Sequence, residues 1–338
     1  MKHDLSLHIA KAHKTPIIPV IAKAGRFYDR QAPMRDVFEK LTTRAAGADA
    51  AHPMVMMIHG QGFDPGIRRA DPYRTIFAYD PYGDRIADYW RLQSWVHRFK
   101  DAAAAPANAL MIGYGWQACA PDFVTSANLN EVARKAVTEA QFFSQFICRL
   151  RQMAPKRRLH VLAHGLGAKV VLRALEQTPN MRIDRLVMLD AVALISDGLL
   201  AMNAKAGHKT ALYNIYDRPT TRMRFFDKYC EKAGPLDHVL GFGFPFQRHR
   251  WVDVPLVDRV GMYNLFDEHP RFAKRRCAKS FPAHFHSDAL ITYILSDAVG
   301  SDVAAIKTKL NDRLRPYQPK RRYAPLWINP LNYVMRPV

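Results

Sequence analysis

The sequence has few cysteines and no long apolar run, and its first residues do not resemble a secretory leader. Its longest strongly apolar runs, such as 16–22 and 54–58, are far shorter than the roughly 20 residues that cross a bilayer, so we expect no transmembrane helix. Its four cysteines include no CxxC pair, which argues against a zinc knuckle and a dense disulfide framework. The N-terminus lacks an apolar stretch followed by a cleavage site, and a cytoplasmic location is therefore predicted.

Acidic residues are scarce relative to basic ones. The 338 residues include 50 Lys and Arg but only 30 Asp and Glu, a formal net charge of +20 that favours acidic partners. Each basic cluster is interpreted as a solvated helix end or loop, but together they could attract an anionic membrane, nucleic acid or an acidic protein. No nucleic-acid-binding motif accompanies them. The clusters are 149–158, 218–228, 271–279 and 315–322.

Short apolar segments alternate with amphipathic ones along most of the chain. The clearest is a helix over 126–153, where apolar side chains recur at three- and four-residue spacing before Pro155. This alternation predicts an α/β fold with a mostly parallel central sheet and helices on both faces. Strands are expected at 54–58, 109–114, 159–162, 186–189, 211–216 and 250–257, and further helices at 85–105, 168–177, 194–204 and 287–299.

The same pattern predicts one main domain over 54–310. An N-terminal extension, 1–53, precedes it, and a basic C-terminal tail, 311–338, follows it. A stretch of about 218–250 interrupts the alternation and is interpreted as a small cap insertion. Its aromatic run GFGFPF suits either an apolar lid over an acyl chain or packing of the cap on the core.

The segment LHVLAHGLGAKVV, residues 159–171, places a sharp turn between a predicted buried strand and a predicted helix. It resembles the nucleophile elbow of the α/β-hydrolase superfamily, in which the pattern G-x-S-x-G presents a serine. Ala163 and Gly167 stand at the two small-residue positions and His164 before the nucleophile position, which is occupied by Gly165. The resemblance therefore implies an α/β-hydrolase fold that lacks the attacking hydroxyl group.

Other parts of the same pattern follow in the chain order of the superfamily. The motif IHGQG, residues 58–62, resembles the His-Gly loop whose backbone N–H groups help to form an oxyanion hole. The resemblance also implies an acid at a strand end and a histidine in a late loop. Carried over, the oxyanion donors are Gln61 or Gly62 together with Leu166, the acid is Asp217 or Asp190, and the base is His284 or His286.

The glycine at position 165 has three explanations. A natural loss of serine would relieve backbone strain of about 1–3 kcal/mol. A deliberate nucleophile knock-out is the second, and chemistry by the histidine and acid alone is the third. Our main hypothesis is a non-catalytic or very weakly active hydrolase-like protein that binds a small acyl- or ester-type ligand or a partner. The alternatives are an esterase- or lipase-type serine hydrolase seen as an inactive variant, and a basic scaffold for anionic membrane or nucleic acid.

Two histidines lie close to these motifs. His59 precedes the glycine of the oxyanion loop, and His164 precedes the elbow position. Neither has a third ligand at a spacing typical of metal sites, so we interpret both as structural hydrogen-bonding groups. We therefore predict no metal site and no cofactor.

Overall fold

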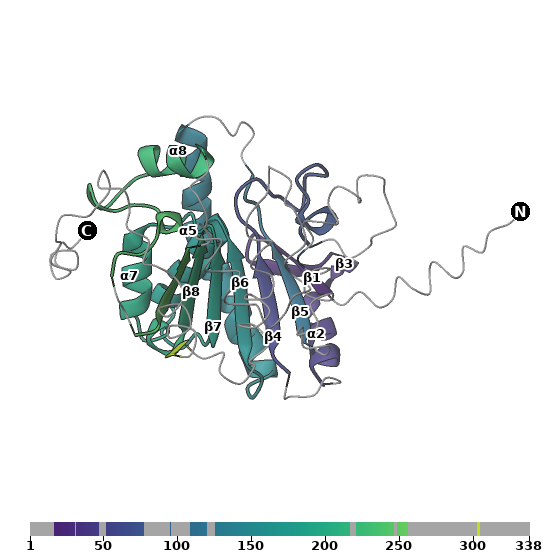
Figure 1. Ribbon diagram of the computed structural model, residues 1–338. Helices are drawn as coiled ribbons and strands as arrows, with labels where there is room; N and C mark the ends of the chain where they lie inside the picture. The colour runs from purple at the N-terminus through teal and green to yellow at the C-terminus, as the bar shows by residue number, and fades with distance from the viewer. Residues whose placement is uncertain are drawn as a thin grey trace, which may run out of the picture.

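The computed structural model describes residues 17–30, 32–46, 52–77, 95, 109–119, 126–216, 221–246, 249–255 and 303–304. These residues form a nine-stranded sheet with the order β3-β2-β1-β5-β4-β6-β7-β8-β9 (Figure 1). The strands are β1 (Ile17–Lys23), β2 (Arg26–Asp29), β3 (Ala32–Asp36), β4 (Met54–Ile58), β5 (Leu110–Gly115), β6 (Leu159–His164), β7 (Arg185–Leu189), β8 (Ala211–Tyr216) and β9 (Trp251–Pro255).

The sheet is mostly parallel. From β1 through β5, β4, β6, β7 and β8 to β9, each strand runs parallel to its neighbour, and β2 is antiparallel to both β1 and β3. The central strand β4 has the sequence MVMMI and is buried along its whole length, as expected for a parallel strand covered on both faces. The predicted α/β fold class is confirmed.

The described helices pack mainly on one face of this sheet. A single apolar core joins them to the strands through side chains such as Met56, Phe143 and Val171. The opposite face carries a second core, built on strand residues such as Met57 and covered in part by Phe77 and Trp95. The helices are α2 (Val37–Ala46), α5 (Ser126–Met153), α6 (Leu166–Gln177), α7 (Ile195–Asn203) and α8 (Thr221–Tyr229), with short 3-10 turns at η1 (Pro72–Arg74), η2 (Gly207–Lys209) and η3 (Leu240–Phe242).

Each predicted strand has a counterpart among β4 to β9, and the helices expected at 126–153, 168–177 and 194–204 correspond to α5, α6 and α7. Segment 1–53, interpreted from the sequence as an extension, contributes β1, β2, β3 and α2 to the same architecture. The helices expected at 85–105 and 287–299 fall almost wholly outside the described residues, as does the tail 311–338. The domain boundaries therefore stay a prediction.

The stretch between β8 and β9 contains α8 and η3. Figure 1 shows α8 beside the first turns of α5, at the end of the sheet where the parallel strands finish. Phe244 of the GFGFPF run is buried and stacks on Trp251 of β9, with ring centroids 4.3 Å apart, so this phenylalanine packs on the core. None of the helices in the described ranges has the length and apolar character needed to cross a membrane.

Candidate functional site

Gly165 forms the turn between β6 and α6. Its backbone has φ 54° and ψ −124°, the mirror image of the first central residue of a type II turn, a conformation that favours glycine. Its N–H donates to the carbonyl of Leu189 at 3.0 Å, and its own carbonyl accepts from Ala168 at 3.1 Å and from Val192 at 3.0 Å. The turn is therefore sharp and firmly tied to the segment that follows β7.

The loop after β4 lies against this turn, backbone to backbone. A Cβ atom added to Gly60 would stand 2.6 Å from the carbonyl oxygen of His164, and one added to Gly167 would stand 2.6 Å from the carbonyl oxygen of His59. Both neighbours are main-chain atoms that cannot rotate away. The small residue expected at position 167 is thus needed for the approach of the β4 loop, and Gly60 has the matching role on the other side.

His59 lies fully buried beneath this junction. Trp116 donates its backbone N–H to Nε2 of His59 at 3.0 Å, so Nε2 is an acceptor and the proton is on Nδ1, which lies 3.0 Å from the carbonyl of Gly60. Burial lowers the pKa of His59 to about 3, although its hydrogen bond to the carbonyl of Gly60 acts to raise the pKa. The imidazole is therefore neutral at physiological pH and links the loop after β4 to the segment after β5.

Tryptophan side chains pack against both histidines of the site. The indole of Trp116 stacks on the His59 ring, with centroids 5.9 Å apart and planes within 9°, and its Nε1 donates to the His59 carbonyl at 3.0 Å. Trp95 meets His164 edge to face at 6.1 Å. Neither tryptophan was predicted from the sequence, although the GYGW run at the end of a predicted strand was the available signal for Trp116.

Gln61 reaches over the elbow. Its side-chain Oε1 accepts a hydrogen bond from the backbone N–H of Leu166 at 3.0 Å. A Cβ atom built on Gly165 would lie well inside van der Waals contact with the same oxygen. The carboxamide of Gln61 therefore occupies the space above the nucleophile position and is the partner of one N–H that the sequence assigns to an oxyanion hole.

The other predicted donor on this loop, Gly62, has a different hydrogen bond. Its N–H donates to the carbonyl of Ala118 at 2.9 Å, which links the loop after β4 to the segment after β5. The backbone N–H of Gln61 is the remaining candidate on this loop. The structure brings Gln61, Gly62 and Leu166 together at the elbow, and their role in binding an oxyanion stays a prediction.

Of the two candidate acids, Asp190 lies beside the elbow. It directly follows β7 with φ 44°, and its N–H donates to the carbonyl of Ile215 at 3.0 Å. Leu189, directly before it, and Val192, two residues after it, are the residues that bond to Gly165. Asp217, His284 and His286 lie outside the described part of the chain, so the acid and base assignments stay predictions.

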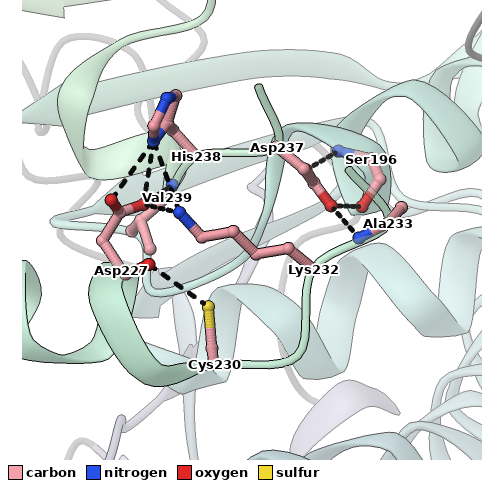
Figure 2. Close-up of polar contacts among 8 residues, drawn as sticks. All are labelled: Ser196, Asp227, Cys230, Lys232, Ala233, Asp237, His238 and Val239. Atoms are coloured by element: carbon pink, nitrogen blue, oxygen red, sulfur yellow. Dashed lines mark hydrogen bonds and ion pairs between the residues drawn. The ribbon is translucent and has the colours of Figure 1, made fainter. Parts of the chain in front are cut away.

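Two carboxylates, Asp227 and Asp237, organise the segment between β8 and β9, as Figure 2 shows. Asp227 of α8 accepts from the N–H of Val239 at 2.9 Å and lies 3.2 Å from both Nδ1 of His238 and Nζ of Lys232. Burial raises the pKa of the neighbouring Cys230 thiol to about 11, so this thiol stays protonated at neutral pH.

The second carboxylate, Asp237, joins the segment between β8 and β9 to α7. It is fully buried and accepts from the N–H of Ser196 at 2.9 Å, from the hydroxyl of Ser196 at 2.8 Å and from the N–H of Ala233 at 3.0 Å (Figure 2). Ser196 lies in the first turn of α7, so the carboxylate satisfies donors of that helix end. Over the residues described, no group of three or more His, Cys, Asp and Glu side chains could hold a metal ion.

The comparisons with known proteins give little beyond the fold class. No protein-family profile matches the sequence, and no curated protein does. Among solved structures, the chain is similar to one described as "Crystal Structure of TT1662 from Thermus thermophilus", with 11% identity and a TM-score of 0.34 over 60% of this chain and 79% of that chain. The α/β fold class rests on the mostly parallel sheet and its helices, not on this similarity.

Proposed function

We propose that this protein is a hydrolase-like binding protein with no efficient catalytic turnover, and that it takes a small acyl- or ester-type ligand or a partner at the carboxyl edge of its sheet. The observation that carries the proposal is Gly165, which stands in the elbow conformation without a hydroxyl group. With no nucleophile on that turn, covalent catalysis of the triad type has no attacking atom.

The position of Gln61 supports the same proposal. An amide carbonyl oxygen already accepts from Leu166 N–H at the start of α6, where a ligand carbonyl would otherwise bind. A ligand with an ester, amide or carboxylate oxygen can replace this internal contact once the Gln61 side chain rotates away. The side chain is long and flexible, so this exchange needs no movement of the backbone.

The serine-hydrolase alternative makes a different demand on position 165. A serine there adds a Cβ that meets Gln61 Oε1, and it keeps a positive φ that costs about 1–3 kcal/mol for a non-glycine residue. Serine therefore requires both a strained turn and a displaced Gln61. Glycine requires neither, which favours a natural glycine at this position.

The test combines Gly165→Ser with the matched control Gly165→Ala, each with and without Gln61→Ala. We expect no ester hydrolysis above background from the unmodified protein or from any variant, measured with short p-nitrophenyl esters. Alanine imposes the same backbone strain without a hydroxyl, so it separates strain from chemistry. Hydrolysis gained with serine but not with alanine, above all in the Gln61→Ala background, would establish the serine-hydrolase alternative.

Binding is tested separately with the unmodified protein. A ligand that binds only the folded state raises its melting temperature by mass action. We expect at least one member of a panel of short-chain esters, amides and carboxylates to do so, and Gln61→Ala to strengthen that effect because the competing carboxamide is gone. A panel that leaves the melting temperature unchanged for both proteins would contradict the ligand-binding part of the proposal.

A further inference from the structure

The amino ends of the parallel strands lie together at the edge of the sheet opposite the elbow. Four loops enter adjacent strands there: 154–158 before β6, 178–184 before β7, 204–210 before β8 and 249–250 before β9. All four carry exposed basic side chains. We call this set the basic edge, and it consists of Lys156, Arg158, Arg182, Lys205, Lys209 and Arg250.

Hydrogen bonds hold the loops of the basic edge beside one another. Arg250 donates from Nη1 to the carbonyl of His208 at 3.1 Å, and the hydroxyl of Thr210 donates to the carbonyl of Ile183 at 2.9 Å. The N–H of Leu159 donates to the carboxylate of Asp184 at 2.8 Å. The loops therefore form a continuous row, and since neighbouring strands lie about 4.8 Å apart, the four entry points span roughly 15 Å.

Within the four described loops, the sequence offers little negative charge to compensate the lysines of this row. Asp184 is the single acidic residue in the sequence of the four loops. Its side chain already accepts from Leu159 and lies 3.8 Å from Arg151 and 3.9 Å from Arg182. It therefore cannot neutralise the lysines at 156, 205 and 209, and the edge presents a field that attracts a negatively charged surface.

The chemistry of the row favours a lipid surface over nucleic acid. Single strands are bound by stacking on exposed aromatic rings, but the large exposed apolar residues of the described chain are Ile67, Leu200 and Tyr229, and none lies in the four loops. Leu200 lies in the last turn of α7, one turn before Lys205. An apolar side chain beside a row of lysines is the combination that suits the interface of an anionic bilayer.

We propose that the basic edge binds the surface of an anionic phospholipid membrane peripherally. The partner is the layer of phosphate-bearing, negatively charged headgroups. Because the elbow lies at the opposite edge of the sheet, such binding leaves the candidate ligand site facing away from the bilayer. The proposal does not depend on the proposed function of that site.

The test is sedimentation of the full-length protein with vesicles of phosphatidylcholine alone or mixed with phosphatidylserine. We compare Lys156→Gln/Lys205→Gln/Lys209→Gln with Arg68→Gln/Arg69→Gln/Arg134→Gln, which removes the same formal charge at exposed positions off the basic edge. We expect binding to the serine-containing vesicles only, weakened by added salt, and reduced at least roughly tenfold by the first triple variant but much less by the second.

Three outcomes would overturn the proposal. Equal losses in the two triple variants would mean that only total charge matters. Full retention of binding in the first variant would place the membrane contact elsewhere in the chain. Binding of duplex or single-stranded DNA that the first variant abolishes, with no vesicle binding by the unmodified protein, would assign the basic edge to nucleic acid.

Discussion

Glu139 on α5 is a carboxyl group that the candidate site does not use. Burial raises its pKa to about 7, although the hydroxyl of Tyr114, which donates to its Oε1 at 2.6 Å, acts in the opposite direction. The ordinary value for glutamate is 4.5. Between these two values the folded protein holds a proton that the unfolded chain has released, so the free energy of unfolding falls as the pH rises from 4.5 to 7.

Replacing Glu139 by glutamine removes this pH dependence, because glutamine resembles the protonated acid at every pH. We expect Glu139→Gln and the unmodified protein to have similar stability near pH 5. Above pH 7 the variant gains on the order of 3 kcal/mol relative to the unmodified protein. Urea unfolding at pH 5, 6, 7 and 8 measures the difference.

The control is Glu131→Gln on the same helix, where Glu131 forms an exposed ion pair with Lys135. Such pairs contribute little, so this variant follows the pH profile of the unmodified protein. Parallel profiles for Glu139→Gln and the unmodified protein would mean that the Glu139 carboxyl titrates normally in the folded state.

At the scale of single residues, the sequence predicts the backbone of the candidate site better than its side chains. Positions 163, 165 and 167 follow a local pattern, because a strand that turns sharply into a helix needs small residues there, and the structure has that turn. The placement of the Gln61 carboxamide over Gly165 depends on a rotamer and on a loop distant in sequence. No local sequence pattern indicates the rotamer or the position of that loop, so the contact of Gln61 with the elbow could not be predicted.

At the scale of whole elements, the segment between β8 and β9 is anchored to α7 through one buried carboxylate. Asp237 connects Ser196 and Ala233 through three hydrogen bonds. Among the described residues it forms no ion pair. Hydrogen bonds to a charged group contribute more than neutral ones, and donors left unpaired in a buried place are costly. The bonds to Asp237 therefore control how firmly the segment between β8 and β9 is held against α7.

We expect Asp237→Ala to destabilise the fold by about 3 kcal/mol, since it leaves buried donors unpaired. Ser196→Ala removes one hydroxyl and leaves the backbone bonds in place, so about 1 kcal/mol is expected. Denaturant unfolding gives both values, and limited proteolysis shows whether cleavage begins within 221–246. Equal effects of the two substitutions would mean that the backbone bonds to Asp237 contribute nothing.

The strands β4 to β9 are predicted from the sequence, but the three strands before them are not, although the apolar run 16–22 carries the same kind of signal for β1. Buried parallel strands are continuous apolar runs between turn residues, and this signal is strong at residues 54–58 or 211–216. β2 and β3 are short, more polar strands at the edge of the sheet. A two-residue hairpin turn joins β1 to β2. Both of its residues, Ala24 and Gly25, have a positive φ, and a single Ala-Gly pair is a weak sequence signal for such a turn.

At the scale of the whole molecule, the sheet separates two apolar cores. Met56 and Met57 are neighbours in β4 and fully buried, but they belong to different cores because successive side chains of a strand point to opposite faces. The core that contains Met56 is closed by α5 and α6. The core that contains Met57 is covered in the described residues by the η1 segment, Trp95 and Val303.

Met56→Ala and Met57→Ala are each expected to destabilise the protein by about 2–5 kcal/mol, measured by denaturant unfolding. Since the two side chains share no core, the double variant should equal the sum of the single ones within about 0.5 kcal/mol. Met54→Ala combined with Met56→Ala is the matched control, because both residues face the same core and a coupling of 0.5 kcal/mol or more is expected. If the pair on opposite faces couples as strongly as the pair on one face, the sheet does not separate two independent cores.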